Sequence, residues 1–169
     1  MFTNISSKNN DLEELEVIEI IKSLCIKYNL PAFTQNILVE KGAVPHSHPI
    51  LTLGTKVKDE RSVLKTLVHE QFHWYAEEHP RYEECIAYLK TKNQDDGEHN
   101  KSGTYPNSYW EHIIVCFNTR NYLKSILSTE ELSWIYTQWQ AYPTLEKLIV
   151  DKYEEIESDL NKFNIILLN

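Results

Sequence analysis

Two histidines four residues apart constrain this chain more than any other feature of its sequence. They are His69 and His73, in the stretch HEQFH at residues 69–73. Apolar residues before this stretch recur at helical spacing, which predicts a helix that begins after the cap residue Asp59 and ends close to Pro80. Residues i and i+4 of a helix project from one face with about 5–6 Å between their Cβ atoms. Both imidazoles can therefore reach one metal ion.

Glu70, the glutamate beside the first histidine, suits a different role. It follows His69 by one position, about 100° around the helix, so it is badly placed to ligate the same ion. It can instead hold a water on the metal and take its proton. Zinc lowers the pKa of such a water to about 7, which makes it a nucleophile at neutral pH. We predict that His69 and His73 bind one Zn²⁺ ion and that Glu70 is the general base.

The motif and its setting resemble those of the zincin metallopeptidases. A predicted strand, PILTLG at residues 49–54, precedes the motif helix, as it does in that group. The resemblance covers residues 45–120. It implies a sheet-edge strand over the HExxH helix that pairs with a peptide substrate, His69 and His73 as metal ligands, and Glu70 as the base. We expect a zinc-dependent metallopeptidase that cleaves peptide or amide bonds. The alternative is a catalytically idle zincin-like protein that uses the metal or the cleft for structure or partner binding.

A catalytic zinc site needs a third protein ligand and an open position. His79 extends the motif to H-E-x-x-H-x-x-A-x-x-H, one residue away from the metzincin pattern. Ala76 stands where metzincins have the glycine that turns the chain, and the only methionine is Met1, so their Met-turn is absent. If the helix persists, His79 points about 120° away from the His73 face. We therefore expect His79 not to be a ligand.

The helix after the long polar loop supplies the other candidates, Glu111 and His112. We predict His112 as the third ligand, because Cys116 one turn later places it on an apolar stripe, where a glutamate without a metal would be costly. A core histidine bonded to the backbone is the alternative for His112. Glu111 would instead complete a two-histidine, one-carboxylate site for another metal. His46 and His48 could form an extra metal patch, but a simple loop before a strand explains them as well.

The remaining pattern predicts an α+β chain, mostly helical, with a small sheet in its N-terminal third and one zincin-like domain over residues 1–169. Two strands are expected, the first with a turn at Lys41-Gly42 and the second in residues 49–56. The first helix is expected to begin at the cap residue Asn10. Further helices are expected in residues 59–79, 81–92, 108–127, 128–142 and 143–163.

Composition limits the partners. The net charge is −8, so the chain repels phosphate backbones and we expect no nucleic-acid partner. No apolar run is long enough to cross a bilayer, and the polar N-terminus lacks the features of a signal peptide. The three cysteines are far apart and form no C-x-x-C pair, which is typical of buried thiols in a reducing compartment. We expect a cytoplasmic protein with a peptide or protein substrate and no membrane partner.

Overall fold

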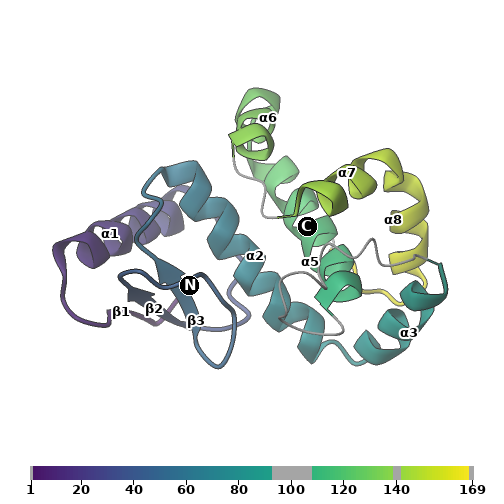
Figure 1. Cartoon of the computed structure of the whole chain (residues 1–169), viewed down its shortest axis with the longest axis horizontal. Helices are drawn as coiled ribbons and strands as arrows, with labels where there is room; N and C mark the ends of the chain where they lie inside the picture. Colours follow the sequence, from purple (N-terminus) through teal and green to yellow (C-terminus); the bar gives the residue numbers. More distant parts are fainter. Residues whose placement is uncertain (1, 93–107, 139–141, 168–169) are drawn as a thin grey trace. The chain divides into compact units, whose positions relative to one another are not determined.

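A three-stranded sheet and seven helices make up the described part of this computed structural model, residues 2–92, 108–138 and 142–167 (Figure 1). The mostly helical α+β class predicted from the sequence is confirmed. The strands are β1 (Asn4–Ser7), β2 (Asn36–Glu40) and β3 (Leu51–Gly54). The helices are α1 (Leu12–Lys27), α2 (Glu60–Glu78), α3 (Tyr82–Lys92), α5 (Ser108–Ile126), α6 (Thr129–Gln138), α7 (Pro143–Asp151) and α8 (Tyr153–Asn161).

Contacts among these elements divide the chain into two compact units. Unit 1 contains Met1–Tyr75 and Ile126–Trp139, and unit 2 contains Ala76–Ser125 and Gln140–Asn169. The boundary falls inside α2, so most of the motif helix belongs to unit 1 and its last three residues belong to unit 2. Each unit has its own set of fully buried apolar side chains.

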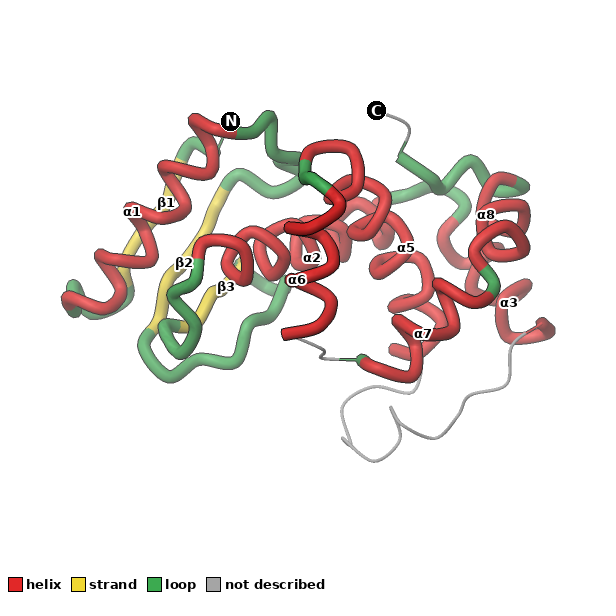
Figure 2. Tube along the Cα trace, turned by 90° about the horizontal axis from the view of Figure 1, so that it is seen from above, coloured by secondary structure: helices red, strands yellow, loops and turns green. Residues whose placement is uncertain are grey.

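The sheet of unit 1 is entirely parallel, in the order β1-β2-β3. Helix α1 makes the crossover from β1 to β2 and packs on both strands. Figure 2 shows the three strands side by side, with α1 running along them. Ile37 and Val39 of β2 pair with Leu51 and Leu53 of β3, and all four side chains are buried. These four residues form the apolar face of the sheet. The strand β1 was missed in the sequence.

The N-terminus of α1 corrects one prediction. Asn10, the expected cap, has a positive φ of 57°, and the cap is Asp11, whose carboxylate accepts the Glu13 backbone N–H. Asn10 instead turns the chain into the helix, a conformation that asparagine adopts more readily than most residues. The predicted start was therefore wrong by one residue.

Glu14, in the first turn of α1, is fully buried and ties three segments of unit 1 together. Its carboxylate accepts hydrogen bonds from the Ser7 hydroxyl, from Asn9 and from the backbone N–H of Lys41. Burial alone raises the pKa of Glu14, but these hydrogen bonds outweigh burial and lower it from 4.5 to about 2. The carboxylate stays charged and holds β1 and the end of β2 against α1.

The chain leaves β2 through the predicted turn. Gly42 has a φ of +79°, and the Ala43 N–H bonds the Glu40 carbonyl across the turn. Glycine favours this backbone conformation because it has no Cβ. The following loop then crosses the end of β3 so closely that a Cβ on Gly54 would lie 2.1 Å from the Ala43 oxygen. Only glycine fits at position 54 without a backbone shift.

Helix α2 begins where the sequence predicts. The Asp59 carboxylate accepts the backbone N–H groups of Arg61 and Ser62. Helix α6, in the same unit, contacts the first half of α2 through cation–π pairs: the Arg61 guanidinium lies 3.7 Å from the Trp134 ring, and the Lys65 ammonium 4.2 Å from the Tyr136 ring. The predicted capping box at the start of α6, Ser128 with Glu131, is confirmed.

Unit 2 packs α3, α5, α7 and α8 around buried apolar side chains. The last predicted helix, 143–163, is broken: α7 ends at Asp151 and α8 begins at Tyr153, because Lys152 leaves helical geometry with φ −119° and ψ 30°. The apolar tail docks through Asn118 of α5, whose side chain donates to the Ile165 carbonyl and accepts the Leu167 N–H.

Candidate metal centre

The two motif histidines converge on one point within unit 1. Their Nε2 atoms lie 3.3 Å apart, and their rings meet edge to face with centroids 5.0 Å apart. Two nitrogen ligands of a tetrahedral zinc ion, each about 2.0–2.1 Å from the metal, lie about 3.3–3.4 Å from each other. The observed separation equals this edge of the tetrahedron, so His69 and His73 fit a zinc ion.

The chemistry of the pair also suits a cation. A neutral imidazole carries a single N–H, so two facing Nε2 atoms can present one donor and one lone pair, or two lone pairs to a metal. His73 is 8% exposed and His69 is half-buried, which limits how far water can solvate the two rings. Imidazole nitrogens with little access to solvent are good zinc ligands.

Glu70 lies beside this pair on α2 and is buried, with 7% of its surface exposed. The helix places its side chain about 100° around the axis from His69. A buried carboxylate is costly unless it has partners, and it interacts strongly with a nearby positive charge. Glu70 directly follows His69 on the same buried stretch of α2, and its role as a general base stays a prediction.

Gln71, inside the motif, fixes α2 against the rest of unit 1. Its side chain is fully buried; the Oε1 atom accepts the backbone N–H groups of Phe33 and Thr34, and the Nε2 atom donates to the Thr34 carbonyl. These three bonds set the rotation of the helix and therefore the direction of the histidines. This role was not predicted, although apolar residues three and four positions away on both sides indicate that Gln71 lies on a buried face of the helix, where a polar side chain needs partners.

Gln71→Ala should lower the free energy of unfolding by about 2–4 kcal/mol, because it leaves two backbone N–H groups and one carbonyl without partners and opens a cavity. Urea unfolding followed by circular dichroism measures this change. Gln138→Ala, at an exposed position of α6, is the matched control and should change stability by less than about 0.5 kcal/mol. Equal effects of the two substitutions would show that Gln71 is no anchor.

The loop before β3 packs on α2 one residue after the motif. The Trp74 indole donates to the Ser47 carbonyl, and the His48 ring stacks on Trp74 at 4.0 Å between centroids. His46 pairs through both backbone groups with Thr52 on the outer edge of β3. The two loop histidines thus have local structural contacts, in line with the simpler interpretation of this segment.

Unit 2 carries the candidates for the third ligand. His112, on α5, is buried, and its ring centroid lies 4.2 Å from that of Tyr142. Beside it, the Glu111 carboxylate accepts a hydrogen bond from the Tyr82 hydroxyl. Burial raises the pKa of Tyr82, and the charges of Glu111 and Glu77 raise it further. Glu77, Tyr82 and Glu111 therefore lie together in this unit.

His79 follows α2 directly, since the helix persists to Glu78. Its Nδ1 atom accepts the backbone N–H of Arg81, and its carbonyl accepts that of Tyr82. These bonds are typical of a residue that caps a helix start, here that of α3. Ala76, the residue in place of the metzincin glycine, stays helical and fully buried.

Searches of family models, curated proteins and solved structures gave no match to this chain. Within residues 2–92, 108–138 and 142–167, none of the helices is both long and apolar enough to cross a membrane. The function has to be inferred from the residues of the site.

Proposed function

We propose that this protein is a zinc-dependent hydrolase, in which His69, His73 and His112 each offer one ring nitrogen to the metal. The observation that carries the proposal is the 3.3 Å separation of the His69 and His73 Nε2 atoms on one face of α2. Two histidines that were four residues apart by chance would not have to bring their ring nitrogens this close together. They would also not have to be followed by a buried glutamate.

Two observations support His112 as the third ligand, one on helix α2 and one within unit 2. Helix α2 continues unbroken into unit 2, where Glu77 lies one turn beyond His73 on the same face. Within unit 2, Glu77 and Glu111 both lie near Tyr82. We prefer His112 to Glu111 because His112 is buried on α5, whereas Glu111 already has a partner in the Tyr82 hydroxyl.

In this proposal Glu70 acts as the general base. When bound, zinc supplies the positive charge that acidifies a water molecule and polarises a substrate carbonyl. The buried Glu70 carboxylate accepts a hydrogen bond from that water, orients it and takes its proton. The same residue can then pass the proton to the leaving amine.

Peptide or amide bonds are the proposed substrates, on the resemblance of the motif and the preceding strand to zincin metallopeptidases. The backbone of Thr52 on the outer edge of β3 is already bonded to His46. A substrate strand would therefore pair beyond Thr52 or displace the loop before β3. The free thiols suit a reducing compartment, and we propose a cytoplasmic location.

The test is hydrolysis of a mixed peptide library, followed by mass spectrometry. We expect cleavage by the purified protein, loss of cleavage with a chelator, and recovery when zinc is restored. Zinc binding without cleavage of any peptide would favour the alternative, an idle zincin-like protein in which the metal serves structure or partner binding. Cleavage that persists in full after the metal is removed would contradict the proposal.

A further inference from the structure

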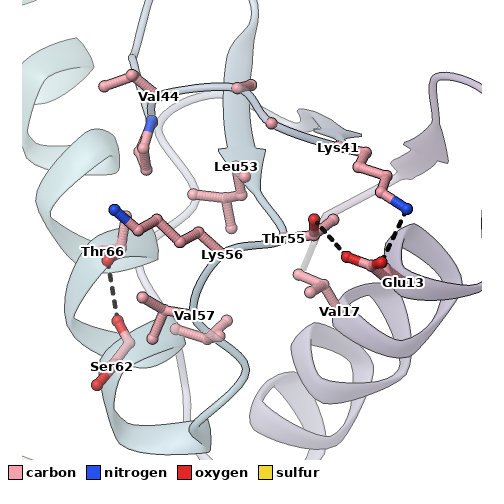
Figure 3. Close-up of a pocket in the computed structure, with 15 residues that line it drawn as sticks. Glu13, Val17, Lys41, Val44, Leu53, Thr55, Lys56, Val57, Ser62 and Thr66 are labelled. Atoms are coloured by element: carbon pink, nitrogen blue, oxygen red, sulfur yellow. Dashed lines mark hydrogen bonds and ion pairs between the residues drawn. The ribbon is translucent and has the colours of Figure 1, made fainter.

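A second feature of unit 1 borders the first two turns of α2, and its lining includes neither motif histidine. It is a cavity of about 630 Å³ between α1, the first two turns of α2 and the end of β3. Figure 3 shows Leu53 and Val57 directed into this space, with Val17 on the α1 side. Val63 of α2 and Val44 of the preceding loop complete an apolar lining. The volume lies within the range of about 300–1,000 Å³ that is typical of small-molecule sites.

The charges around the cavity are unequal. Glu13 has a cationic partner, because its carboxylate lies 2.8 Å from the Lys41 ammonium, which also lies 3.3 Å from Asp11, and it accepts the Thr55 hydroxyl at 3.2 Å. Lys56 is exposed, and no acidic side chain in the described part of the chain pairs with it. Figure 3 shows its ammonium directed across the cavity toward Thr66 of α2. The cavity therefore has an apolar body and one uncompensated positive charge.

Its place in the fold also suits an anionic ligand. Residues 41–45 and 54–57 follow directly after β2 and β3, so the cavity lies at the carboxyl ends of two parallel strands. Ligands of open parallel sheets bind outside these ends. Ser62 comes from the first turn of α2, where the helix dipole favours negative charge.

We propose that this cavity binds a monocarboxylate with an apolar body, whose carboxylate pairs with Lys56 and whose hydrocarbon part fills the space between Val17, Leu53 and Val63. At about 30 Å³ per water molecule, the cavity holds about 20 waters, so a ligand with on the order of 10–15 non-hydrogen atoms fits. A free aryl or alkyl acid has this chemistry, and so does the C-terminal apolar residue of a peptide. The site needs no metal and includes none of His69, Glu70 and His73, although Thr66 lies one turn before His69 on α2.

The experiment is a titration of the full chain with 3-phenylpropanoate, followed by backbone amide NMR shifts. EDTA in the buffer prevents the carboxylate from binding through a metal. We expect a Kd of about 0.1–1 mM and shifts concentrated in residues 42–45, 53–57 and 62–66. The matched neutral ligand, 3-phenylpropan-1-ol, should bind about 3–5-fold more weakly, because it lacks the charge. Equal affinity for acid and alcohol, or shifts confined to other residues, would overturn the proposal.

Variants separate charge from shape. Lys56→Gln is a substitution of an exposed residue and should keep the fold. It should weaken binding of the acid by about 3–5-fold and leave binding of the alcohol unchanged. Lys58→Gln is the control, since Lys58 already pairs with Glu16 and does not line the cavity. Val57→Phe should fill the cavity and weaken the binding of both ligands by about 10-fold or more. If Lys58→Gln weakens the acid as much as Lys56→Gln does, the assignment of the charge is wrong.

A last pair of ligands identifies the source of the carboxylate. Acetyl-Gly-Gly-Phe and its C-terminal amide are titrated in the same way. Tighter binding of the peptide acid than of its amide, with shifts in the cavity, assigns the site to peptide C-termini. Binding of the free acid alone assigns it to small organic acids. Both results support the proposed chemistry, whereas preferential binding of the amide contradicts it.

Discussion

Glu70→Gln should lower kcat for peptide hydrolysis by about 10²–10⁴-fold and leave zinc bound, because the amide keeps the shape of the side chain but cannot take a proton. The effect should fall on kcat more than on KM, since the base acts on the reacting water and not on substrate binding. The measurement is steady-state cleavage of the best peptide from the library, with the metal content of each sample determined in parallel.

The control for this substitution is Glu78→Gln, an exposed glutamate near the end of the same helix. It removes the same charge and should leave kcat within about twofold, because exposed charges are screened. If Glu70→Gln cleaves as fast as the wild type with its zinc in place, Glu70 is not the base.

His112→Ala should weaken zinc binding by more than about 100-fold, while His79→Ala should change it by less than about threefold. Loss of residues that only support metal ligands typically costs 10–100-fold, so loss of a ligand should exceed that range. His79 has its Nδ1 atom bonded to the Arg81 backbone and follows a helix that does not turn at Ala76. Competition with a fluorescent zinc chelator measures both affinities.

The opposite ranking would move the protein toward the metzincin pattern, with His79 as the third ligand. Glu111→Gln provides the matched comparison for the neighbouring carboxylate. If this substitution weakens zinc binding more than His112→Ala does, the site is a two-histidine, one-carboxylate centre.

The motif helix could be predicted from local signals alone. Asp59 caps the helix by accepting backbone N–H groups of the first turn, and the apolar residues that follow recur at the spacing of an α-helix. The i, i+4 spacing of His69 and His73 then fixes their common face, whatever packs around it. These parts of the site depend on residues close in sequence, and for that reason they could be predicted.

The features that could not be predicted depend on contacts between segments that are distant in the sequence. β1 has no strong alternation of apolar residues, and it is a strand because Asn4–Ser7 pair with β2 more than 30 residues later. The break at Lys152 involves no proline or glycine, so no local signal marks it. Gln71 is an anchor only because Phe33 and Thr34 lie beside α2. The third ligand that we propose, His112, would depend in the same way on packing between residues distant in sequence.

The metal content of the purified protein tests the central claim most directly. The protein is purified without chelator from medium that contains zinc, and zinc per chain is measured by mass spectrometry. We predict about one zinc per wild-type chain and less than about 0.1 per chain for a folded His73→Ala variant, because the helical pair of imidazoles is the core of the site. Wild-type protein that contains no zinc and takes up none when zinc is added would contradict the account.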